Sequence, residues 1–102
     1  MATFSAILVP AGAATNQTVA GTTAGTAVVL GPRTKFAINA NQDINLVFYS
    51  TTHTITPSAT VGFRVPANAT MTFDLSDFYD TIRFFNISGT STVVSIQPLT
   101  VN

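Results

Sequence analysis

The sequence predicts an all-β fold, built as one antiparallel sandwich or small barrel. Beyond residue 26, apolar side chains recur at every second position, which is the period of strands and not of helices. Clusters of glycine, proline, asparagine and aspartate separate these segments at short intervals, and no amphipathic helix of useful length is present. A length of 102 residues limits the chain to one domain with a single core.

The clearest alternation lies at 61–65 and 71–75. In these two segments the polar positions alternate with apolar ones, namely Val61, Phe63, Val65, Met71, Phe73 and Leu75. The residues between them, Pro66-Ala67-Asn68, have turn chemistry, so we expect a hairpin. An odd loop length from 66 to 70 would set Phe63 opposite Phe73 in the core and bring Arg64 within reach of Asp74 on the outer face.

Similar patterns predict the remaining elements. Further strands are expected at 26–30, 34–39, 44–50, 80–87 and 91–98, with a weaker candidate at 52–56. The one helical candidate is a single turn at 76–79, where Ser76 could cap the amino end.

Residues 10–25 differ in kind, because they are small, uncharged and poor in large apolar side chains. Ahead of them, a short apolar run that includes Phe4, Ile7 and Val9 could form one more strand. Two interpretations remain open. The segment is either an arm that reaches a neighbouring subunit or an edge strand of the chain's own sheet.

The charge content points to assembly with other protein. Only four basic and four acidic residues are present, and the net charge is zero, whereas soluble domains devote about a quarter of their residues to charge. Without like-charge repulsion, the chain is expected to pack against other protein, including copies of itself. Four basic residues are too few to neutralise a run of phosphates, which argues against nucleic acid. No stretch approaches the roughly 18 apolar residues that a membrane helix needs.

The sequence contains no catalytic constellation, and we expect neither enzyme activity nor a cofactor. His53 is the only histidine and there is no cysteine, so one chain lacks the three or four convergent ligands of a metal site. Asp74, Asp77 and Asp80 cluster, but they lack the alternating acids, central glycine and terminal glutamate of an EF-hand. Structural roles explain these acids sufficiently.

Aromatic residues supply the candidate contacts with partners. Phe84 and Phe85 are adjacent, so in a strand they point to opposite faces, and one of them must leave the core of a two-layer sandwich. Because charged residues are depleted and aromatic residues enriched in interface cores, the predicted interface residues are Phe4, Ile7, Val9, Phe78, Tyr79 and Phe85.

The last 45 or so residues resemble small β-rich structural proteins of tailed bacteriophages. The likeness lies in the run VGFRVPANATMTFDLS from Val61, in which a "VPAN-x-T" segment leads to the run TIRFFNISGTSTVVSI from Thr81 and a closing strand. The likeness lies in this order of strand and turn segments and not in a diagnostic motif. It implies a virion component such as a capsid decoration or cement protein.

Together these observations predict a β-sandwich of jelly-roll type with an extended amino-terminal arm: residues 1–25 as arm and tether, and 26–102 as the sandwich. The expected function is a decoration or cement protein that binds the major capsid protein at capsomer junctions as a homo-oligomer, in the form of a trimer. It would be made in the host cytoplasm, since no signal-peptide pattern is present, and would act on the capsid surface. The alternative is a carbohydrate- or receptor-binding module of a phage tail or fibre, with Tyr49, Tyr79 or an outward phenylalanine stacking on a sugar.

Overall fold

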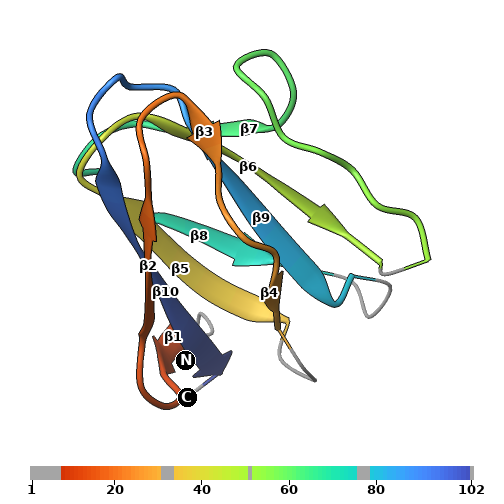
Figure 1. Ribbon diagram of the computed structural model, residues 1–102. Coiled ribbons are helices and arrows are strands. Elements are labelled where there is room, and N and C mark those ends of the chain that lie inside the picture. The colour runs from red at the N-terminus through yellow and green to blue at the C-terminus, as the bar shows by residue number, and fades with distance from the viewer. Residues whose placement is uncertain (1–7, 31–33, 51, 76–78, 102) are drawn as a thin grey trace, which may run out of the picture.

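Two antiparallel sheets pack together as a β-sandwich in the computed structural model, which describes residues 8–30, 34–50, 52–75 and 79–101 (Figure 1). The first sheet contains β1 (Leu8–Pro10), β2 (Thr15–Val19), β5 (Lys35–Ala40), β8 (Met71–Asp74) and β10 (Thr92–Val101). The second sheet contains β3 (Thr23–Ala24), β4 (Val28–Val29), β6 (Ile44–Tyr49), β7 (Phe63–Val65) and β9 (Thr81–Asn86). The described residues include no helix.

The strand order places the amino-terminal strands on one side of the sandwich. The first sheet has the order β1-β10-β5-β8, with β2 also paired to β10, and the second has the order β3-β9-β6-β7, with β4 also paired to β9. We call the side formed by β1 to β4 the closed edge, and the side formed by β7 and β8 the open edge. Figure 1 shows β2 rising along the closed edge to β3, from which the chain descends to β4.

Alternating side chains from both sheets fill the core. In β5, Phe36, Ile38 and Ala40 are buried while the residues between them are half-buried, as the period of two requires. Phe84 of β9 is fully buried, whereas its neighbour Phe85 is half-buried on the other face. The cluster also includes Val19, Leu30, Ile44, Leu46, Phe48, Val65, Ile82, Val94 and Ile96.

Pro98 of β10 lies opposite the interruption between β1 and β2. Pro10 pairs with Leu99 and Thr15 pairs with Ile96, so four residues on this strand face two on β10. The N–H of Ala11 donates to the carbonyl of Pro98 at 2.9 Å, and in a strand the N and O of one residue face the same neighbour. The missing N–H of Pro98 therefore faces the interruption, where no donor is needed.

The strand predictions after residue 26 are confirmed for seven segments, but the predicted hairpin is wrong. β7 and β8 do not pair with each other: β7 pairs with β6 in the second sheet, and β8 pairs with β5 in the first. The turn after Pro66 does form, with Asn68 at a φ of 62°, but it carries the chain from one sheet to the other. Consequently Arg64 does not meet Asp74. Its Nε donates to Asn45 Oδ1 at 3.0 Å.

The outer face of β6 is covered as well, so all six of its residues are buried. The segment between β6 and β7 lies against this face: Pro57 is buried, and Asn45 Nδ2 donates to the carbonyl of Ser58 at 2.7 Å. Figure 1 shows the segment as the green chain that returns to β7. No strand forms at 52–56, contrary to the weaker prediction; a single bridge joins Ser50 to His53.

The described strands of the amino-terminal segment belong to the chain's own sheets. Residues 8–10 and 15–19 pair with β10, and residues 23–24 pair with β9. This part follows the edge-strand interpretation and not that of a free arm. Residues 1–7 and three residues of the predicted helical turn, 76–78, lie outside the described residues.

Candidate functional site

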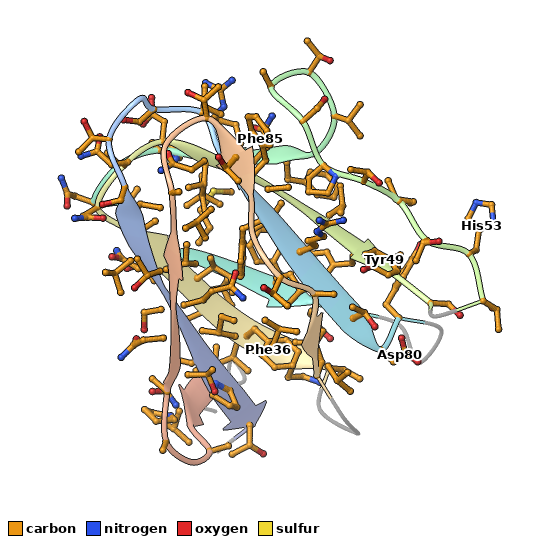
Figure 2. The ribbon with its side chains drawn as sticks, in the orientation of Figure 1. Phe36, Tyr49, His53, Asp80 and Phe85 are labelled. Atoms are coloured by element: carbon orange, nitrogen blue, oxygen red, sulfur yellow. The ribbon has the colours of Figure 1, made fainter. Side chains whose placement is uncertain are left out.

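The described residues contain no group of three or more histidine, cysteine, aspartate or glutamate side chains placed to hold a metal ion. His53 is exposed on the segment between β6 and β7, where its backbone N–H donates to the carbonyl of Ser50 at 2.9 Å. Figure 2 shows its ring pointing away from the sheets.

Each described carboxylate has a structural contact. Asp74 Oδ1 lies 3.5 Å from Lys35 Nζ across the β5–β8 pair. Asp43 Oδ1 accepts a hydrogen bond from the N–H of Ala67 at 2.7 Å, and Asp80 Oδ1 accepts one from Thr81 Oγ1 at 2.8 Å. Asp77 lies outside the described residues. The acidic cluster of the sequence is thus spread over separate local contacts where the structure describes it.

Three of the predicted interface residues, Val9, Tyr79 and Phe85, are among the described residues, and they lie at separate places. Val9 is half-buried in β1 on the closed edge, and Phe85 is half-buried on the outer face of β9, opposite Ala24 and Asn45. Figure 2 shows Phe85 beside β3, far from Tyr49 at the other end of the sheet. Tyr79 is exposed at the open edge. Phe4, Ile7 and Phe78 lie outside the described residues.

A concave site lies at the open edge, and we call it the aromatic pocket. Its volume is about 370 Å³, and its lining consists of Phe48, Phe63, Phe73, Asp74, Leu75 and Tyr79. The Phe73 ring lies 5.2 Å from that of Phe48, edge to face, and 6.3 Å from that of Phe63. Phe48 is buried, whereas Phe63 and Tyr79 are 61% and 42% exposed. The aromatic pocket therefore has a buried inner ring and exposed outer rings.

Sheet membership explains how these rings meet. Phe48 comes from β6 and Phe63 from β7, in the second sheet, while Phe73 comes from β8 in the first. β7 and β8 are the last strands of their sheets on the same side, so no further strand among the described residues covers the space between them. Lys35 is not part of the pocket lining. It pairs with Asp74 across β5 and β8, next to the pair of Phe36 and Phe73, and successive side chains of a strand point to opposite faces, so the ion pair lies on the outer face of the first sheet.

Sequence reasoning placed Phe63 and Phe73 together but assigned both rings to the core. The two rings do lie near each other, across the sheets instead of along a hairpin. Alternation shows which residues share a face of a strand, but not how far the opposite sheet extends beneath that face. No local signal marks Phe63 as exposed, because its exposure depends on which strands end each sheet.

Comparison with known protein families, with curated proteins and with solved structures gives no match to this chain. No helix among the described residues is long and apolar enough to cross a membrane.

Proposed function

We propose that this chain is a virion structural protein of a tailed bacteriophage, a decoration or cement protein that binds the major capsid protein at capsomer junctions as a homotrimer. Its task is mechanical and not catalytic. Many weak contacts with several shell subunits add up through avidity, which holds neighbouring capsomers together. In this proposal Phe4 and Ile7, which precede β1, contact a neighbouring subunit.

The observation that carries the proposal is the apolar surface of an almost uncharged sandwich. Val29 is 74% exposed on β4, Phe63 is 61% exposed on β7 and Val93 is 47% exposed on β10. The chain has eight charged residues and no net charge. Apolar side chains on several strands, with few charges to desolvate, suit a protein covered by neighbours on more than one side.

The strand order supports a jelly-roll fold. If β1 with β2, and β3 with β4, count as one interrupted strand each, eight strands remain. The first then pairs with the eighth, the second with the seventh, the third with the sixth and the fourth with the fifth. This is the pattern of one long hairpin rolled into two four-stranded sheets, an architecture found in capsid and lectin domains.

The proposal can be tested with purified protein and empty shells of the parent virus. We expect sedimentation in physiological salt to show a trimer, and the protein to co-sediment with the shells. Val29→Lys and Val93→Lys should weaken trimer formation or shell binding, because each places a charge on exposed apolar surface. Thr72→Lys, on an exposed position of β8, is the matched control and should leave both unchanged. A stable monomer that does not bind the shells would refute the proposal.

A further inference from the structure

Two hydrogen bonds show which way the backbone groups of β10 point. The N–H of Ala11, after β1, donates to the carbonyl of Pro98 at 2.9 Å. The N–H of Val93 donates to Asn41 Oδ1, beyond the end of β5, at 3.0 Å. Successive residues of a strand direct their backbone groups to opposite neighbours. The even-numbered residues of β10 therefore face β1 and β2, and the odd-numbered residues face β5.

β2 has two residues whose backbone groups point outward. The register pairs Gln17 with Val94, an even-numbered residue, so Gln17 bonds to β10. Asn16 and Thr18, on either side of Gln17, direct their N–H and C=O groups away from β10. No other strand among the described residues pairs with β2, so these four groups form an unpaired edge.

Three other edge strands carry features that discourage the addition of a further strand, whereas β2 carries none. In β1, Pro10 faces outward because the N–H of the next residue faces β10, and a proline has no N–H to offer. At the open edge, β7 includes Arg64 and β8 includes Asp74. β2 has the sequence TNQTV, with neither proline nor charge. A strand of another chain can therefore add to β2.

The outward groups of β2 are complementary to those of a second copy. In antiparallel pairing about a two-fold axis at Gln17, Asn16 of each copy lies opposite Thr18 of the other. Each of these two residue pairs would exchange two N–H···O=C bonds. The four bonds use every outward backbone group of both residues, and the amide and hydroxyl side chains can also hydrogen-bond across the pair.

The same axis brings the second sheets of the two copies together. Gln17 Nε2 donates to the carbonyl of Thr26 at 2.9 Å, so the axis passes near the link between β3 and β4 (Figure 1). β3 of one copy then lies beside β4 of the other, with Ala24 near Val29 of the second copy. Val29 is 74% exposed and Ala24 pairs with half-buried Phe85. The contact would therefore cover the most exposed of these apolar side chains.

The lack of charge at the closed edge favours a second copy as the occupant. A two-fold axis places a residue near its own symmetry copy, so a charge at this edge would meet a like charge. β1 to β4 contain no charged residue. Arg83 lies one strand further in, on β9, so the two Arg83 backbones would be three strand spacings apart, about 14 Å, which exceeds the Debye length of about 8 Å. We infer that two copies of this chain pair through β2 about a two-fold axis at Gln17.

This inference goes beyond the structural role proposed above, because the pairing joins two chains whether or not each belongs to a trimer. One strand pair is a small contact, so we expect weak pairing that increases with protein concentration. Amide hydrogen exchange of the isolated full chain, followed by NMR, measures it. The amides of Asn16 and Thr18 should exchange about tenfold more slowly when about 90% of the chains are paired. The Thr72 amide, which points outward on β8 because that of Leu75 faces β5, is the control and should not change.

Cysteine variants test the register, and the chain has no cysteine of its own. In the proposed pair, residues 16 and 18 of opposite copies have Cα atoms about 5.5 Å apart, within the range of a disulfide. Two residues 16 lie diagonally, about 7–8 Å apart, at the limit beyond which a disulfide does not form. An oxidised mixture of Asn16→Cys and Thr18→Cys should therefore give a covalent dimer on a non-reducing gel, whereas either variant alone should give little.

Proline substitutions test the hydrogen bonds. Thr18→Pro removes two of the four bonds between the copies and no bond to β10, so it should weaken pairing about 30-fold. Thr72→Pro removes an outward N–H of β8 and is the matched control, which should pair as the unaltered chain does. Sedimentation over a range of concentrations measures the pairing of both variants, and thermal melts verify that both are folded.

Exchange at Asn16 and Thr18 that does not depend on concentration would overturn the inference. Equal cross-linking of a single cysteine variant and of the mixture would also overturn it, because the register would differ. Slow exchange without the cross-link would mean that another segment covers β2, and equal weakening by Thr72→Pro would place the contact elsewhere; either result overturns the inference. Sedimentation of Thr18→Pro, whose β2 edge is impaired, tests the proposed trimer by itself, so each proposal can fail without the other.

Discussion

Replacing Asn86 with alanine should destabilise the sandwich because this side chain joins its two sheets. Asn86 is fully buried at the end of β9. Its Nδ2 donates to the carbonyl of Val19 in β2 at 3.2 Å and to the carbonyl of Thr90 at 2.7 Å. Its Oδ1 accepts a hydrogen bond from the N–H of Ser88 at 3.0 Å. One amide thus holds the closed edge together and fixes the following turn.

The expected loss of stability depends on how deeply each polar group that loses its hydrogen-bond partner is buried. The bond to Val19 is buried, and a buried polar group left unpaired costs about 1–3 kcal/mol. The bonds to Thr90 and Ser88 are partly buried, so water can replace part of each and the loss is smaller, about 0.5–1 kcal/mol. We expect a total near 3 kcal/mol, which lowers the Tm of a domain of this size by about 10–25 °C.

Asn39→Ala is the matched control. Asn39 Nδ2 makes one exposed hydrogen bond, to Thr70 Oγ1 at 3.1 Å, and its loss should cost about 0.5 kcal/mol or less. Thermal and urea melts followed by circular dichroism measure both variants against the unaltered chain. If the two substitutions lowered the Tm by the same amount, the buried amide would not join the sheets and the reasoning would be refuted.

Three further predictions use the same melts. Arg64→Ala should cost about 1–3 kcal/mol, because it leaves the Oδ1 of buried Asn45 without its donor; a loss within about 0.5 kcal/mol would mean that water replaces the arginine. Gly21→Ala should destabilise strongly, because a Cβ there would collide with the backbone carbonyl of Gly89, whereas Gly89→Ala meets nothing within 4 Å and should be neutral. Deletion of residues 1–25 should abolish cooperative unfolding, since it removes three strands and a buried valine of the core; a truncated chain that still melts cooperatively would restore the arm interpretation.

The sequence predicted the strands well because local patterns determine them. Burial alternates residue by residue in β5 and, from Ile82 onward, in β9. The predicted boundaries of these strands lie within about two residues of the observed ones, the usual uncertainty of strand ends. The sheet that a strand joins is not determined by the strand's local sequence. A five-residue connection that begins at Pro66 fits a hairpin as well as it fits a crossing between sheets. Only the competing partners β5 and β6 decide between the two.

The amino-terminal segment shows a second limit of sequence reasoning. Its composition is too poor in large apolar residues to predict an ordered element, yet β2 pairs with β10 over five residues. Backbone hydrogen bonds depend little on side chains, so the neighbouring strand can order a segment that has almost no core residues of its own. Val19 is the exception, because its fully buried side chain fixes the face that β2 presents to the core. The candidate site escaped prediction for a related reason, since Phe63 lies on β7, which ends its sheet among the described strands.

The distribution of charge separates the two edges of the sandwich. At the open edge, β7 includes Arg64 and β8 includes Asp74, and charged side chains on edge strands discourage the addition of further strands. None of the four strands of the closed edge contains a charged residue, and the backbone of β2 is paired on one side only among the described strands. An edge strand with unpaired backbone groups and no charged side chain can pair with a strand of another chain unless another protein covers it. The proposed assembly supplies such a cover at the closed edge.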